Sequence, residues 1–292
     1  MKFSNKQKGI FALILLAFLF ASMGVFSRYL KTSFTLFQQV YLRIGVAFLL
    51  SLIIFNKKID LKKIKKLPIR EWLVLIFRSL TTHLFGVSLF TYGILNAKYS
   101  NVSFISALPL TAVFGFILLK EKFSYQKLLY VFLAFLGVIF ISASDFNNVF
   151  NWGKGELVTL ISVAFFSLSY ISRKWHSKIL NNYEITTLIF FISLISILFT
   201  SISLKEGLPF NNWSYFILLV VFGAGVFNVG NLFLTNYGFE RVKAVLASNL
   251  LALELIFALL IGFLFYRELP NLKEIIGGSL ILLSVIQMNK LK

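Results

Sequence analysis

The sequence has no cysteine, only four prolines and few charged residues among its 292 positions. Without cysteine the chain can form no disulfide, no thiolate nucleophile and no cysteine-ligated metal site. Charged residues make up 14% of the chain and hydrophobic residues 58%, whereas soluble domains carry about 25% charged residues. So few charges cannot cover the surface of a water-soluble fold of this size. The composition therefore predicts a membrane protein.

Acidic residues are also scarce, since 11 Asp and Glu face 29 Lys and Arg and give a formal net charge of +18. A nucleic-acid-binding protein gathers its basic residues on one exposed face or helix. Here they lie in short gaps between apolar runs, where lysines anchor helix ends and set orientation. We therefore expect no nucleic-acid partner.

Ten apolar segments follow one another along the chain, each with about the length of a membrane-crossing helix. Because backbone groups in lipid cannot bond to water, these segments are expected to be helices rather than strands. The first is too long for a signal peptide and is expected to be retained, and Pro109 is expected to bend the fourth. The predicted spans are 9–27, 34–55, 72–95, 100–119, 128–144, 155–172, 184–203, 213–238, 242–265 and 272–288.

Basic residues are distributed unequally between the two sides of the membrane. The segments that share a side with the N-terminus hold 20 of the 29 Lys and Arg residues, most densely between Lys57 and Arg70. Short loops rich in Lys and Arg stay in the cytoplasm. The sequence therefore predicts a multi-pass protein of the cell membrane, inner or plasma, with both termini cytoplasmic.

An internal repeat divides the chain into residues 1–146 and 147–292. Ser27-Arg28 recurs as Ser172-Arg173, and Tyr92-Gly93 recurs as Tyr237-Gly238, about 145 residues later. Each half holds five predicted spans, and an odd number of crossings places the second copy upside down. Inverted repeats are a recurrent carrier architecture, with the substrate near mid-membrane between the halves. We therefore expect an all-α membrane protein of ten helices in two inverted five-helix repeats around a central cavity.

Several short motifs in both halves resemble the EamA family of the drug/metabolite transporter superfamily. The resemblance implies a ten-helix carrier or exporter of amino acids, nucleoside-like compounds or related solutes. Glu121 and Glu268, at helix ends beside basic residues, are expected to be interfacial anchors within the family's turn motif. The matching positions are Arg43, Phe77-Arg78-Ser79, Phe90-Thr91-Tyr92-Gly93, Ala107-Leu108-Pro109-Leu110, Leu119-Lys120-Glu121-Lys122, Leu253-Glu254-Leu255 and Arg267-Glu268.

Four ionisable residues fall inside predicted spans: Arg43, Arg78, His83 and Glu254. A charge at the bilayer centre costs about 2.5–3.5 kcal/mol on insertion scales and marks a functional site by default. Glu254 is expected to bind substrate and couple transport to protons, with a buried structural pair as the alternative. Arg43 is expected to be a structural or gating counter-charge, with Glu254 as its candidate partner. Arg78, nearer the cytoplasmic edge, is expected to gate the path or to reach the interface by snorkelling.

Asn228 and Asn231 share one face of the eighth span, and the repeat relates Asn228 to His83. Polar positions at mid-depth are expected to line a central cavity, although asparagines also join helices to each other. His83 is a candidate substrate contact, and its alternative is a satisfied polar core residue. Ser103, which begins a stripe of small residues in the fourth span, completes the predicted substrate-binding set.

The sequence thus favours a secondary carrier that moves a small polar or amphipathic metabolite by alternating access, coupled to protons or to exchange. No Gly-rich nucleotide-binding loop ending in Gly-Lys-Ser/Thr is present, which argues against ATP-driven transport. A channel or lipid-scrambling protein is the alternative. A membrane enzyme would need clustered His, Asp or Glu, which the sequence does not show, so we expect no catalytic residue, metal or cofactor. The expected partners are a small solute, the lipid bilayer and, left open, a second copy in a homodimer.

Overall fold

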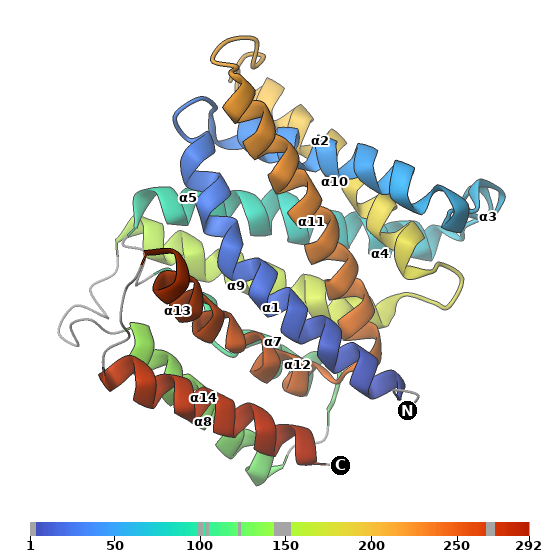
Figure 1. The fold of residues 1–292 in the computed structure, drawn as a ribbon. Helices are drawn as coiled ribbons and strands as arrows, with labels where there is room; N and C mark the ends of the chain where they lie inside the picture. The colour runs from blue at the N-terminus through green and yellow to red at the C-terminus, as the bar shows by residue number, and fades with distance from the viewer. Residues whose placement is uncertain are drawn as a thin grey trace.

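The computed structural model describes residues 4–97, 102, 105–121, 124–142, 153–266 and 272–291, in which helices are joined by turns and loops and no strand occurs (Figure 1). The helices are α1 (Asn5–Leu30), α2 (Leu36–Phe55), η1 (Asn56–Lys58), α3 (Leu61–Lys65), α4 (Ile69–Ser79), η2 (Leu80–Val87), α5 (Ser88–Asn96), α7 (Leu110–Leu118), α8 (Tyr125–Ser142), α9 (Lys154–Ser172), η3 (Arg173–Trp175), α10 (Asn182–Ser203), α11 (Tyr215–Arg241), α12 (Ala244–Leu251), α13 (Leu253–Tyr266) and α14 (Leu272–Lys290).

The outer surface of this bundle is apolar. Phe11 on α1 and Phe199 on α10 expose 70% and 71% of their surfaces. A water-soluble protein would not leave such residues in contact with solvent over most of its faces, whereas lipid accepts them. Within the described residues, six helices are long and apolar enough to cross a membrane. They lie at Asn5–Ser27, Leu36–Lys58, Ile69–Asn96, Lys154–Trp175, Asn182–Ser203 and Tyr215–Arg241.

Two of the predicted spans are interrupted near their middle. In the fourth, helical residues end at Ser106 and α7 begins after Pro109, as the missing amide hydrogen of proline requires. In the ninth, which we predicted as one segment, a turn at Ala252 separates α12 from α13. The amide of Ala252 bonds to the carbonyl of Asn249 at 3.2 Å, and this tighter bond ends α12 without a proline.

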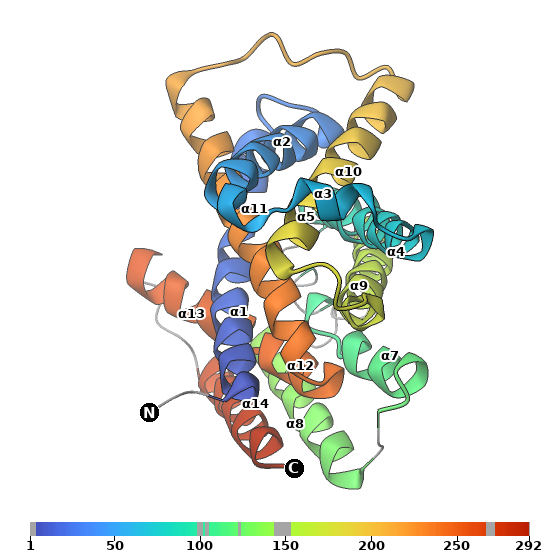
Figure 2. The same cartoon turned by 90° about the vertical axis from the view of Figure 1, so that its right-hand side faces the viewer.

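Most of the extensive helix packing joins residues 4–142, the first half, to residues 153–291, the second half. Helix α1 packs on α11, and the counterpart of α1 in the repeat, α9, packs on η2 and α5. The other large contacts between the halves join α2 with α10 and with α11, α7 with α12, and α8 with α14. The packing therefore follows a pseudo-twofold relation between the halves (Figure 2).

Both chain ends lie at the same end of the bundle (Figure 1). We call this end, where α4 begins and α9 ends, the inner end. The opposite end, where α1 ends and α11 begins, is the outer end.

The seam between α8 and α14 offers a test of this packing. A Cβ atom at Gly137 would lie 2.5 Å from the carbonyl oxygen of Gly277, whereas a Cβ atom at Gly278 would lie 3.9 Å from its nearest neighbour. We expect Gly137→Ala to cost about 1–3 kcal/mol by overpacking and to lower the Tm of the detergent-purified protein by several degrees. Gly278→Ala is the matched control and should leave Tm unchanged or slightly raised. Equal effects of the two substitutions would contradict the seam.

Candidate functional site

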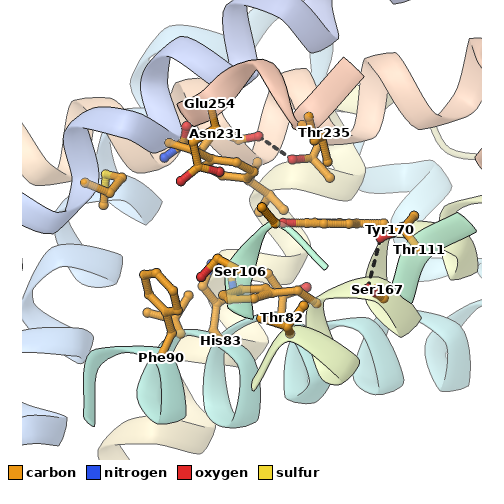
Figure 3. A pocket seen from close by; sticks show the side chains of 18 of the residues that line it. Thr82, His83, Phe90, Ser106, Thr111, Ser167, Tyr170, Asn231, Thr235 and Glu254 are labelled. Atoms are coloured by element: carbon orange, nitrogen blue, oxygen red, sulfur yellow. Dashed lines mark hydrogen bonds between the residues drawn. The ribbon is translucent and has the colours of Figure 1, made fainter. Parts of the chain in front are cut away.

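A cavity of about 150 Å³ lies where helices of both halves meet. Its walls combine aromatic rings, hydroxyl groups and amides with three ionisable side chains, Arg43, His83 and Glu254. Glu254 and Asn231 approach it from one side and His83 from the opposite side, with the ring of Tyr170 between them (Figure 3). An apolar pocket with a few convergent polar groups is the usual form of a small-molecule site.

Both interrupted helices contribute to the cavity wall. Ser106, Ala107 and Leu108 line it just before α7 begins, and Ala252 and Glu254 line it where α13 begins. A helix N-terminus carries unpaired amide groups and a partial positive charge. Glu254 lies in the first turn of α13, where this partial charge favours a carboxylate.

Arg43 is almost fully buried, and neutral groups hold it. Its Nη1 donates to Ser27 Oγ at 2.9 Å, its Nη2 to Thr91 Oγ1 at 3.4 Å and its Nε to the carbonyl of Gln39 at 3.2 Å. The four ion pairs found among the described residues do not include Arg43 with Glu254. The expected pairing is therefore absent from this conformation.

His83 lies in η2, a π-helical segment within the third predicted span, which stays helical through it. Such segments often mark functional sites, because the extra residue per turn redirects side chains. The Nδ1 atom of His83 lies 2.8 Å from Ser193 Oγ, and the ring lies 5.5 Å from that of Phe190. His83 is thus both a satisfied buried residue, as its alternative interpretation predicted, and part of the cavity wall.

Asn228 and Asn231 both line the cavity, as the spacing on their helix predicted. The backbone carbonyl of Asn231 accepts a hydrogen bond from Thr235 Oγ1 at 2.7 Å. Its side-chain oxygen is buried and has no hydrogen-bond partner among the described residues. Because an unpaired buried acceptor is costly, this atom is a candidate contact for a donor group on a ligand.

The sequence analysis missed the face that α9 presents to the cavity. Val163, Phe166, Ser167 and Tyr170 all line it, and their spacing of three, one and three residues places them on one helical stripe. The ring of Tyr170 stacks on that of Phe166, with centroids 6.1 Å apart. Ser167 accepts a hydrogen bond from Thr111 of the first half at 2.9 Å. The signal in the sequence was this stripe, which is hard to recognise because apolar residues also lie on the other faces of α9.

Arg78 does not line the cavity, and the expectation that it snorkels to the interface is wrong. Its side chain is fully buried between α4, α9 and α11, where it donates to the carbonyl of Ser169 and to Asn236. Helices of the second half cover this end of α4, so no path leads from the guanidinium to the membrane surface.

Three further predicted positions have different outcomes. Ser103 lies outside the described residues, as does Glu268. Glu121 caps α12, because the amides of Ala244 and Val245 donate to its carboxylate at 2.6 and 3.3 Å. It therefore joins the two halves rather than anchoring the chain to the membrane interface.

Comparisons with known proteins agree with this architecture. Residues 7–143 and 153–290 each match the profile of the EamA-like transporter family. The crystal structure of another protein superposes with a TM-score of 0.75, covering 97% of this chain and 95% of that one, at 15% sequence identity. At that identity the likeness shows the fold alone. No curated protein matches the chain significantly. Because the family profile matches twice and covers nearly the whole sequence, the chain belongs to the EamA-like transporter family, a family of multi-pass membrane proteins.

Proposed function

We propose that the protein is a secondary carrier that moves a small polar or amphipathic metabolite, such as an amino acid or nucleoside-like compound, by alternating access. The proposal includes ten membrane crossings in two inverted repeats, residues 1–146 and 147–292. It places both termini in the cytoplasm, so that the inner end faces the cytoplasm. The shared position of the two chain ends supports an even number of crossings.

One observation carries the proposal: the cavity is built by both halves, between two interrupted helices that occupy corresponding positions in the repeat. Interrupted helices free backbone groups for a ligand at membrane depth. A pseudo-twofold arrangement gives two similar end states, one open to each side, because either half can take the position of the other. A channel with a fixed pore does not require this pseudo-twofold arrangement of its halves.

Each cavity residue would contact a different group of the solute, according to its side-chain chemistry. Glu254 can bind a cationic group of the solute or take up and release a proton, and Arg43 can hold an anionic group. His83, Asn228 and Asn231 supply neutral hydrogen-bonding groups between them. Ser103 is retained as a proposed substrate contact, and Arg78 as a gating residue away from the solute.

Counterflow tests this function directly. Purified protein in lipid vesicles would be loaded with an unlabelled compound and supplied with the same compound in radiolabelled form, across a set of amino acids and nucleosides. Saturable exchange of at least one compound is expected. Flux that does not saturate would support a channel, and chemical conversion of a compound would support an enzyme.

Glu254→Gln separates coupling from exchange. Glutamine keeps the size of the side chain but cannot ionise, so we expect accumulation driven by a pH gradient to be abolished while counterflow is retained. The control is Glu206→Gln, because Glu206 lies outside the cavity. The amide oxygen of glutamine can still accept from the amide of Phe37, and its NH2 group can donate to the hydroxyl of Ser201, which now donates to Glu206. Equal loss of pH-driven accumulation and counterflow in Glu254→Gln would contradict the proposed role of Glu254 in coupling.

Asn231→Leu tests the unpaired acceptor in the cavity. Losing one hydrogen bond to the solute, worth about 1.5 kcal/mol, should raise the KM of the exchanged compound roughly tenfold. Thr187→Val is the matched control, because Thr187 Oγ1 is also buried and unpartnered among the described residues but does not line the cavity. A KM that is unchanged in Asn231→Leu would contradict the assignment.

A further inference from the structure

The inner end contains a buried polar network that belongs to the second half. Asn236 donates to Thr186 Oγ1 at 2.9 Å, and Thr186 in turn donates to the carbonyl of Asn182 at 2.7 Å. The side chain of Asn182 accepts from Arg173 Nη2 at 2.7 Å and donates to Glu240 at 2.7 Å. The short helix η3 and the inner ends of α10 and α11 are thereby joined without any residue of the first half.

Arg78 joins the first half to this network. Its Nη2 donates to Asn236 Oδ1 at 2.7 Å, and its Nε donates to the carbonyl of Ser169 at 3.2 Å. Both partners belong to the second half. Its Nη1 is buried without a partner among the described residues, so the guanidinium is held by fewer bonds than it can form. Such a contact stabilises one relative position of the two halves but does not lock them in it.

Glu71, two turns earlier on α4, makes a second connection of the same kind. Its carboxylate accepts from the amide of Ser177 at 2.7 Å and lies 2.9 Å from His176 Nδ1. Burial, together with the nearby Arg78 and Arg173, holds the pKa of His176 below its usual range, although Glu71 acts in the opposite direction. His176 is therefore neutral at pH 7, and its Nδ1–H donates to the carboxylate. Both partners of Glu71 again belong to the second half.

The pseudo-symmetric position at the outer end has a different chemistry. The offset of about 145 residues relates Glu71 to Phe216 and Arg78 to Gly223. Phe216 packs on Tyr29 with ring centroids 5.7 Å apart, and a Cβ atom at Gly223 would lie 3.3 Å from the ring of Phe26. The seam between α1 and α11 at the outer end is thus aromatic. The equivalent seam between α4 and α9 at the inner end is charged and hydrogen-bonded.

We propose that Arg78 and Glu71 form the inner gate of the carrier, which is closed in this structure, and that the aromatic seam of α1 and α11 is its outer counterpart. The inference rests on the proposed alternating access. Opening to the inner side requires α4 to leave α9 and α11, which breaks every hydrogen bond that these two side chains make in the described chain. The network of the second half can stay assembled during this movement. The directional bonds of the inner gate favour the inward-closed state, because they form only at one relative position of the halves.

Side-specific labelling of a cavity residue tests the gate. The chain has no cysteine, so Ser106→Cys places the only thiol in the cavity wall. Its reaction with a membrane-impermeant maleimide would be timed in inside-out and right-side-out vesicles. We expect Arg78→Met to speed labelling from the inner side by about tenfold or more, since losing a buried charged partner shifts a two-state equilibrium by at least that factor.

Two companion variants keep this test sharp. Asn249→Leu also removes a buried amide, but its hydrogen bonds go to Ser284 in the same half, so it should leave labelling from either side unchanged. His176→Phe removes a donor to Glu71 and should increase labelling from the inner side in the same direction, which covers the case that Arg78→Met fails to fold. The proposal is overturned if the folded variants label from the inner side at the background rate.

Labelling requires no solute, so the gate and the proposed function can fail separately. Faster labelling from the inner side without counterflow of any amino acid or nucleoside would support the gate and count against the proposed solutes. Counterflow together with unchanged labelling in Arg78→Met and His176→Phe would contradict the gate alone.

Discussion

The helices of each half pack mainly against helices of the other half, and the rest of the structure depends on this packing between the halves. The large helix contacts run between them, α1 with α11, η2 and α5 with α9, and α8 with α14. Close approach at glycine makes several of these seams tight: a Cβ at Gly238 would lie 2.7 Å from Leu13. Because lipid offers no hydrophobic driving force between helices, close packing of this kind has to supply the association.

The cavity follows from the same arrangement. The fourth and ninth predicted spans, one from each half, are both interrupted, and residues at both interruptions line the cavity. The polar groups that face it come from both halves, and Arg43 and Glu254 lie there without an ion pair to each other. A site of this composition can bind a solute with separated polar groups while its aromatic walls exclude water.

The two ends of the molecule are alike in topology and unlike in chemistry. Hydrogen bonds to Arg78 and Glu71 need a fixed geometry, so the inner seam is stable in one register only. Ring contacts such as that of Tyr29 with Phe216 are less directional. The repeat therefore makes the two ends similar in shape, while the few residues that it does not match make them different in chemistry.

The sequence alone determined the class of the protein, the positions of its helices and its twofold repeat. The length of each apolar segment and the spacing between Tyr92-Gly93 and Tyr237-Gly238 can be read from the sequence without knowing how the helices pack. It also predicted that Asn228, Asn231, Glu254 and His83 lie at mid-depth. Polar residues are costly in lipid, so their presence within an apolar segment indicates a site. The sequence analysis placed Arg78 wrongly, missed Tyr170 and predicted the ninth span as continuous. Only the tertiary structure decided these points, because burial at a helix end, the covering of an aromatic face and a turn without proline all depend on which helix packs alongside.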